Sequence, residues 1–345
     1  MKKLKVFDLF TGVAGFSLGI IRALGKENVE IVGFGDIEKD PIAINKYNFP
    51  GVKNYKDGEK LPDFDLLVGG SPCQDLSIAG KREGLFGKRS GLFFYFIQLL
   101  KEKQPINFIF ENVKGLLSSN KGRDFKIVQK EFKKAGYEIE FQLLNSKDFG
   151  VPQKRQRIYV VGHLKGLSKC KIFPLQSNFK STIVKNILET QIVSSKYYLS
   201  NVYLETLKRH RARQEAKGHG FGYIIIKNNE IANTIVIGGM GKERNLIIDK
   251  RLKDYTPITA IKGVVNREGI RRMTPIEWER LQAFPDNWTK FGINEKGNKY
   301  EVSDCKRYKA MGNALIVNIV TEIVKKLYNS SIKLIPKEIQ LELFN

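Results

Sequence analysis

The sequence predicts an α/β protein in which a parallel sheet is covered by helices. From residue 4 to about 164, short apolar runs alternate with segments of helical period, which is the pattern of strand-helix-strand units. The chain of 345 residues is long enough for a large core, either as two domains or as one α/β domain with an insertion. Its composition, with 42% hydrophobic and 28% charged residues, is that of a soluble globular protein.

The expected strands are short apolar runs bounded by Gly, Asp, Asn or Lys. They span residues 4–10, 29–35, 65–70, 106–112, 137–144 and 157–164. The expected helices between them span residues 16–24, 41–47, 91–103 and 123–135. Ligands of such sheets bind beyond the carboxyl ends of the strands, so the residues that follow the strands are the candidates for a site.

The regular alternation stops at about residue 165 and returns at about residue 263. The stretch between is irregular and basic, with 18 Lys and Arg against 7 Asp and Glu, and we expect a separate domain that faces a polyanion. After it, Thr274-Pro275 open a helix, and the stretch from Arg307 is expected to be a loop followed by a long apolar helix. The expected division is 1–164, 165–262, 263–328, and a tail or packed edge at 329–345.

The net charge of +23 is the strongest global signal, and it favours nucleic acid as a partner. The alternative is a lysine-rich surface that reflects the base composition of the genome. No apolar run of 18 residues occurs, and the start "MKKLKVFDLFTG" carries no cleavage site, so we expect a cytoplasmic protein. Cys73, Cys170 and Cys305 are too few and too far apart for a disulfide framework or a zinc site, and no metal is expected.

The first expected strand ends in "DLFTGVAGFSLG", where Gly12 and Gly15 allow a tight turn into a helix. The turn is not GxGxxG and no Lys-Ser/Thr follows it, which argues against a phosphate-binding loop. Asp36 ends the second strand, where a carboxylate can bind both hydroxyls of a ribose. With Ile37 beside it, Asp36 indicates an adenosine-bearing cofactor; the alternative is that Asp36 or Asp40 begins a helix.

Cys73 lies just past the third strand, in "GGSPCQ", and not within the apolar run. A thiolate is the nucleophilic form of cysteine, and a strand tip near helix N-termini and basic residues favours ionisation. An inert, half-buried thiol is the alternative at this point.

Two further sets of charged residues lie at the ends of predicted strands. Glu111 ends the next strand, where a carboxyl could bind a substrate or donate a proton, or could cap a helix together with Asn112. Arg155 and Arg157 alternate before the last strand and are expected to project to the same side. Two aligned guanidiniums suit an anionic backbone or a carbonyl oxygen, and a solvated basic face is the alternative.

Taken together, these stretches resemble the cytosine-5 DNA methyltransferase family of bacterial or phage restriction-modification systems. The matching segments, in the family's order, are "DLFTGVAGF", "GDIEKDPIAINKYNF", "GGSPCQDLSIAGKREGLFGKRSGLFF", "FENVKGL", "DFGVPQKRQRIYVVG", "RRMTPIEWERLQAFP" and "YKAMGNALIVNIV". The resemblance implies an S-adenosylmethionine-dependent methyltransferase (Rossmann-like) fold, with a mixed sheet and helices on both faces. It also implies that the basic stretch 165–262 is a smaller, irregular target-recognition domain.

The resemblance also implies a mechanism. Cys73 would add to C6 of a cytosine flipped out of duplex DNA, and C5 would then take the methyl group of S-adenosyl-L-methionine, leaving S-adenosyl-L-homocysteine. Glu111 would bind the N3 and amino edge of the base. Arg157, with Arg155 nearby, would hold O2 or support a loop.

The remaining site residues follow from the same resemblance. For the cofactor, these would be Phe10, Gly12 and Gly15 in the pocket wall and turn, Asp36 on the ribose, Ile37 on the adenine, Asp57 on the adenine amino group, and Asn313 at the methionine end. For DNA, they would be Ser77 and Arg89 in a mobile loop at 75–91, and Lys208, Arg209, Arg211, Gly239, Lys242 and Arg244 in the central stretch. The expected substrate is double-stranded DNA with a short recognition sequence, bound by a monomer that acts independently of any cognate endonuclease.

Three residues depart from the family's pattern, namely Ala14, Ser71 and Ala314. Two other functions stay open, an RNA (tRNA) cytosine-5 methyltransferase and a catalytically inactive nucleic-acid-binding relative. The long basic central stretch favours DNA over RNA, and the presence of Cys73, Glu111 and both arginines argues against an inactive protein.

Overall fold

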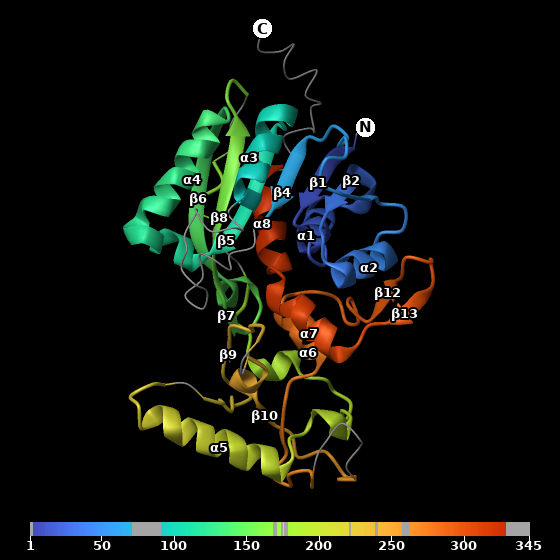
Figure 1. The fold of residues 1–345 in the computed structure, drawn as a ribbon, viewed down its shortest axis with the longest axis vertical. Helices are drawn as coiled ribbons and strands as arrows, with labels where there is room; N and C mark the ends of the chain where they lie inside the picture. The colour runs from blue at the N-terminus through green and yellow to red at the C-terminus, as the bar shows by residue number, and fades with distance from the viewer. Residues whose placement is uncertain are drawn as a thin grey trace.

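A seven-stranded mixed sheet forms the centre of the N-terminal part (Figure 1). The computed structural model describes residues 3–70, 91–167, 171–173, 175, 179–220, 222–238, 241–256 and 263–328. The strand order is β3-β2-β1-β4-β5-β8-β6, and β8 runs antiparallel to both of its neighbours while the other neighbouring pairs are parallel. The strands are β1 (Leu4–Leu9), β2 (Val29–Gly35), β3 (Asn54–Tyr55), β4 (Leu66–Gly69), β5 (Asn107–Val113), β6 (Tyr137–Asn145) and β8 (Gln156–Leu164).

Helices cover both faces of this sheet. Successive side chains of a strand point to opposite faces, and so Val6 packs into one hydrophobic cluster and Phe7 into the other. The Val6 face packs against α1 (Gly15–Leu24) and α8 (Val317–Leu327), and the Phe7 face packs against α3 (Gly91–Lys103) and α4 (Arg123–Lys134). Burial on two sides explains why the central strands are nearly continuous apolar runs. The predicted mixed sheet with helices on both faces is confirmed.

The segment before α8 corrects one prediction. Residues from Arg307 were expected to begin with a loop, but they belong to helix α7 (Asp304–Asn313). Gly312 and Asn313 resemble a turn signal, whereas Tyr308 and Met311 are spaced three apart and both are buried. Gly312 serves close packing instead, since a Cβ there would lie 2.6 Å from Cγ1 of Ile237.

The central stretch forms the lower end of the molecule in Figure 1 and contains helix α5 (Asn201–Glu215). The expectation of wholly irregular structure is therefore wrong for this segment. Ser200 caps the helix by accepting a hydrogen bond from the N–H of Tyr203 at 3.2 Å. The short elements of this and the adjoining segments are β7 (Gln153–Lys154), β9 (Ala232–Asn233), β10 (Ile247–Ile248), β11 (Ile270–Arg271), α2 (Lys39–Asn48), α6 (Pro275–Leu281), β12 (Phe291–Ile293) and β13 (Lys299–Glu301).

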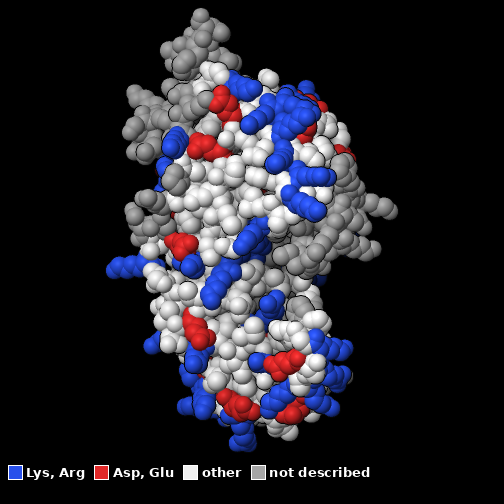
Figure 2. All heavy atoms as spheres, turned by 90° about the vertical axis from the view of Figure 1, so that its left-hand side faces the viewer, with Lys and Arg blue, Asp and Glu red and all other residues white. Residues whose placement is uncertain are grey.

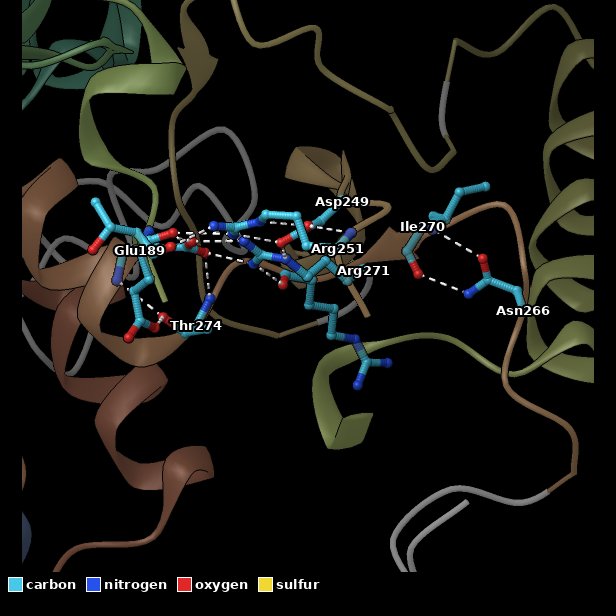
Figure 3. Close-up of polar contacts among 10 residues, drawn as sticks. Glu189, Asp249, Arg251, Asn266, Ile270, Arg271 and Thr274 are labelled. Atoms are coloured by element: carbon cyan, nitrogen blue, oxygen red, sulfur yellow. Dashed lines mark hydrogen bonds and ion pairs between the residues drawn. The ribbon is translucent and has the colours of Figure 1, made fainter. Parts of the chain in front are cut away.

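A buried ion-pair network joins the central stretch to α6 (Figure 3). The guanidinium of Arg271 donates to both carboxylate oxygens of Glu277 at 2.8 Å and to Asp249 at 3.0 Å. Asp249 also accepts hydrogen bonds from Arg251, and these bonds hold the pKa of Asp249 well below its usual range. Glu277 completes a capping box with Thr274 at the start of α6. Each buried charge therefore has a partner, as a buried charge requires.

Within the described ranges, no helix is long and apolar enough to cross a membrane. The same part of the chain holds no group of three or more His, Cys, Asp or Glu side chains placed to hold a metal ion.

Candidate active site

The turn between β1 and α1 is built on left-handed backbone. Phe10, Gly12 and Ala14 have φ angles of 56°, 53° and 57°. The N–H groups of Phe10 and Thr11 donate to the carbonyl of Gly35, at 2.6 and 3.2 Å, which ties the turn to the end of β2. Ala14 is a non-glycine residue in the left-handed region, a backbone conformation that favours glycine.

The two glycines of the turn are required for different physical reasons. Gly12 needs its positive φ, and a Cβ there would meet nothing within 4 Å, so space is open beside it. Gly15 instead allows close packing, because a Cβ there would lie 3.0 Å from Leu315, just beyond α7. The turn thus brings the residues after β1 against the residues after α7.

Asp36 lies at the end of β2 with its carboxylate fixed by two amides. Oδ2 accepts from the N–H of Gly12 at 2.7 Å, and Oδ1 accepts from the N–H of Glu38 at 2.8 Å. Burial raises the pKa of Asp36, and these amides oppose the rise. Asp36 does not cap α2, which begins at Lys39. Its orientation leaves carboxylate lone pairs for the hydroxyls of a ligand.

Ile37 follows Asp36 directly and is 87% exposed. An isoleucine that is this exposed contributes nothing to the core, so its apolar surface is available to a ligand. Asp57 is also exposed, on the loop after β3, and β3 pairs in parallel with β2. Because parallel strands end at the same edge, Asp57 lies on the edge that carries Asp36.

Asn313 ends α7 and is exposed. Two ion pairs join α7 to the segment after β2, Lys309 with Glu38 and Lys306 with Asp40, both at 2.7 Å. The predicted cofactor residues therefore come from four segments at one edge of the sheet. They are Phe10, Gly12, Gly15, Asp36, Ile37, Asp57 and Asn313.

Glu111 lies in β5, beside the end of β4. The two strands are parallel, with Gly69 opposite Phe110, and a Cβ at Gly70 would lie 2.9 Å from Oε2 of Glu111. Gly70 is the last described residue before residues 71–90, which include Cys73, Ser77 and Arg89. These three residues and Gly239 lie outside the described residues. Glu111 is therefore adjacent to the point from which the chain continues toward Cys73.

Arg157 forms an ion pair with Glu111. Its Nε lies 3.0 Å from Oε1 of Glu111, and the two side chains are only 16% and 15% exposed. Burial raises the pKa of Glu111, while the charges of Arg157 and Arg155 oppose the rise. A raised pKa favours the protonated form of this carboxyl, which can donate a proton to a group that lies against it.

Arg155 makes different contacts. Its guanidinium donates to the carbonyls of Ile235 at 3.1 Å, Gly312 at 3.3 Å and Ala314 at 2.8 Å, and the side chain is 3% exposed. Of the two roles that the sequence left open, support of a neighbouring segment is the one these contacts fit.

The predicted DNA-binding residues that are described fall into two groups. Lys208, Arg209 and Arg211 are exposed on α5, where Lys208 pairs with Glu205 and Arg211 with Glu215. The second group, Lys242 and Arg244, lies in the short helical turn Gly241–Asn245. The Nζ of Lys242 lies 4.7 Å from the ring centre of Tyr308 on α7. Figure 2 shows Lys and Arg over the upper and lower parts of one face, with Asp and Glu covering less of it.

Several residues that support the site are not predicted by any motif of the sequence. Asp8 is fully buried below the turn, where its Oδ2 accepts hydrogen bonds from the N–H and hydroxyl of Ser17. Burial raises the pKa of Asp8 to about 7. Asn45 and Trp288 bind the carbonyls of Gly12 and Val13 at 2.8 and 2.9 Å. Among these residues, only Asp8 has a signal in the sequence, because it is a lone acidic residue inside an apolar strand.

The order of the strands and the residues at their carboxyl edge define the fold of S-adenosylmethionine-dependent methyltransferases. The chain belongs to the C-5 cytosine-specific DNA methylase family, whose family model matches residues 4–329. It is therefore a DNA cytosine-5 methyltransferase, and the predictions of fold, family and enzyme class are confirmed.

Individual proteins agree with this assignment. The chain is 40% identical over 340 residues to the Type II methyltransferase M.HpaII of Haemophilus parainfluenzae, with 94% of this chain and 89% of that protein covered. It is 34% identical over 332 residues to the Type II methyltransferase M1.ScrFI of Lactococcus lactis subsp. cremoris, with 94% and 78% covered.

Solved structures share the fold. The methyltransferase EhMeth of Entamoeba histolytica superposes with a TM-score of 0.71 at 16% identity, with 96% of this chain and 100% of that chain covered. A putative DNA modification methyltransferase encoded within a prophage of E. coli superposes with a TM-score of 0.64 at 20% identity, with 95% and 99% covered.

Proposed function

We propose that this enzyme flips a cytosine out of duplex DNA, bonds it covalently through Cys73 and methylates its C5, with S-adenosyl-L-methionine as donor. We further infer that residues 165–262 are the target-recognition domain. The methylation protects DNA in a restriction-modification system, in line with the "Type II methyltransferase" names of the relatives. The protein acts in the cytoplasm as a monomer that recognises a short sequence in double-stranded DNA, independently of an endonuclease.

The residues at the carboxyl edge of the sheet fit this donor. Asp36 presents an oriented carboxylate for the two ribose hydroxyls, exposed Ile37 offers an apolar surface for the adenine, and Gly12 leaves room beside the turn. Asp57 and Asn313 lie at the same edge and would bind the adenine amino group and the methionine end. When bound, S-adenosylmethionine supplies a methyl group on a sulfonium, which a nucleophilic carbon can accept.

The protein's own residues make C5 nucleophilic. The thiolate of Cys73 forms a bond to C6 of cytosine, the C5–C6 π electrons move toward N3, and Glu111 gives N3 a proton. The neutral enamine that results carries electron density at C5. Arg157 holds O2 of the base and keeps Glu111 in place. After C5 is methylated, a base removes its proton, the C6–S bond breaks, N3 returns its proton, and the thiolate of Cys73 is restored.

Basic residues supply the DNA-binding surface. A target base is shielded inside a duplex, and its extrusion costs a few kcal/mol that contacts to the flanking DNA must offset. Exposed Lys208, Arg209 and Arg211 on α5 suit phosphates, while Lys242 and Arg244 lie nearer the catalytic part. Ser77, Arg89 and Gly239 complete the proposed DNA-binding set.

One observation carries the proposal: Glu111, paired with Arg157, lies against Gly70, three residues before Cys73. The test supplies labelled methyl donor with duplex DNA, tRNA or no nucleic acid. We expect label in C5 of DNA cytosine for the wild type and none for Cys73→Ala. The matched control is Cys305→Ala, since Cys305 is an exposed free cysteine on α7, and this variant should retain activity.

A second readout addresses the covalent bond. Duplex DNA that contains 5-fluorocytosine should trap a denaturant-resistant adduct, because fluorine cannot leave as the proton does. Label found only in tRNA, or equal label with Cys73→Ala, contradicts the proposal. Bisulfite sequencing of DNA from cells that express the protein then gives the recognition sequence and the methylated cytosine.

A further inference from the structure

Arg155 connects three segments that are far apart in the sequence. One guanidinium nitrogen donates to the carbonyl of Ile235 in the central stretch. The other terminal nitrogen donates to the carbonyls of Gly312 and Ala314, at the end of α7. The main chain of Arg155 is itself fixed, because its N–H donates to Oγ of Ser146 at 3.0 Å. A planar guanidinium suits such a role, since its donors point in fixed directions.

Two fully buried glutamines complete this arrangement. Gln153 accepts from the N–H of Ile235 at 3.0 Å and donates to the carbonyl of Leu281 at 2.8 Å. Gln282 donates to the carbonyls of Met311 at 2.8 Å and Ala314 at 3.0 Å. The N–H and the carbonyl of Ile235 are therefore both hydrogen-bonded, the N–H to Gln153 and the carbonyl to Arg155.

The segments held by Arg155 lead to two different sites. Asn313, the proposed contact to the methionine end of the donor, lies between Gly312 and Ala314, whose carbonyls Arg155 binds. Ile235 precedes the proposed DNA contacts Lys242 and Arg244 by seven and nine residues. The two segments also touch directly, since Gly312 leaves room for Ile237 and a Cβ would come within 2.6 Å of it. The two segments are therefore in direct contact and are bound by the same guanidinium.

We propose that Arg155 is a positioning residue that couples DNA binding by the central domain to donor binding at the Asn313 end of the active site. The inference rests on the proposed function, because it takes the donor and DNA sites from there. Arg155 does not need to touch the base or the donor for this role. Its neighbouring charges are Arg157 and Glu111, so it also contributes to the potential at Glu111.

The test compares S-adenosylhomocysteine binding by calorimetry in free protein and in protein saturated with a duplex that carries the methylated sequence. For the wild type, the duplex should change the Kd of S-adenosylhomocysteine by about 5- to 150-fold, the usual range of such coupling. In Arg155→Lys the ratio should fall close to one, because a lysine head group is a point charge that cannot bridge the three carbonyls.

Arg271→Lys is the matched control. Arg271 is equally buried and also joins the central stretch to the catalytic part, but its partners are Asp249, Glu277 and the carbonyl of Arg272. It should retain the wild-type ratio even if it lowers stability. If Arg155→Lys fails to fold, Gln282→Met replaces it, since this change removes two hydrogen bonds to the same α7 segment and keeps the side-chain volume similar.

The possible results distinguish failure of this inference from failure of the proposed function. A wild-type ratio in the Arg155→Lys or Gln282→Met protein overturns the inference, and so does an equal loss in Arg271→Lys, which would make the effect one of general domain docking. A wild type that binds both ligands with no coupling also overturns it. A wild type that binds neither S-adenosylhomocysteine nor duplex DNA contradicts the proposed function instead.

Discussion

Replacement of Ile37 separates binding of the donor from stability of the fold. Because Ile37 is 87% exposed, Ile37→Ala removes almost no buried surface from the free protein, and the free energy of unfolding should change by less than about 0.5 kcal/mol. Full burial of an isoleucine contributes about 1.5–3 kcal/mol. An adenine that covers one side of Ile37 buries about half of it, so the variant should lose about 1 kcal/mol of binding, which is about 5-fold in Kd.

The assay is calorimetric titration with S-adenosylhomocysteine, with urea unfolding measured in parallel. Ile192→Ala is the matched control, since Ile192 is 51% exposed in the central stretch, away from the proposed donor site. It should bind the ligand as the wild type does. The reasoning is refuted if Ile37→Ala keeps wild-type affinity, if both variants weaken equally, or if Ile37→Ala lowers stability by more than it lowers affinity.

Three further predictions follow from buried carboxyl groups. Glu111→Gln should lower the methylation rate by about 10²- to 10⁴-fold while S-adenosylhomocysteine still binds, because the proton donor to N3 is lost; a wild-type single-turnover rate would contradict this. Asp8 has a pKa raised to about 7 from an ordinary value of 3.8, so its folded state favours the neutral form. The free energy of unfolding is therefore highest below about pH 4, where this carboxyl is protonated in both the folded and the unfolded state. It falls as the pH rises to about 7, because the unfolded state ionises first. Relative to Asp8→Asn, the wild type should therefore lose up to about 1.4 kcal/mol of unfolding free energy per pH unit across that window. Urea unfolding measures this difference, and the same pH dependence in both proteins would refute the prediction. Glu277→Gln leaves Arg271 short of one of its two carboxylate partners and should lower the free energy of unfolding by about 3 kcal/mol, whereas a change below about 1 kcal/mol would mean that the network adds little.

The sheet, and the edge at which the candidate site residues lie, could be predicted because they depend on local patterns. Strands buried on both faces are apolar runs, and the candidate site residues lie at their carboxyl ends, with Asp36 directly after β2 and Glu111 near the end of β5. The expected helix at residues 91–103 and the expected strand at 29–35 match the observed bounds. These features need no knowledge of distant segments.

The errors arose where tertiary contacts decide the structure. The loop predicted from Arg307 on is instead part of α7, where Gly312 is required by the approach of Ile237, more than 70 residues away in the chain. The apolar pattern does not predict α5, because only Leu204 and Leu207 of its 15 residues are buried.

The spacing of Arg155 and Arg157 predicted two similar arginines. Their partners differ because Ile235, Gly312 and Ala314 approach only one of them. No pattern around residue 155 contains that information.

Besides the ion pairs of Arg271, several contacts between the central stretch and the catalytic part go to main-chain atoms. Besides the contacts to Ile235, Arg280 donates to the carbonyls of Ile187 and Leu188, and Glu277 accepts from the N–H of Glu189. Every amino acid supplies a carbonyl, and every residue but proline an N–H, so these contacts persist when side chains of the central stretch change. The catalytic part can thus hold the proposed target-recognition domain in place while the side chains of that domain change.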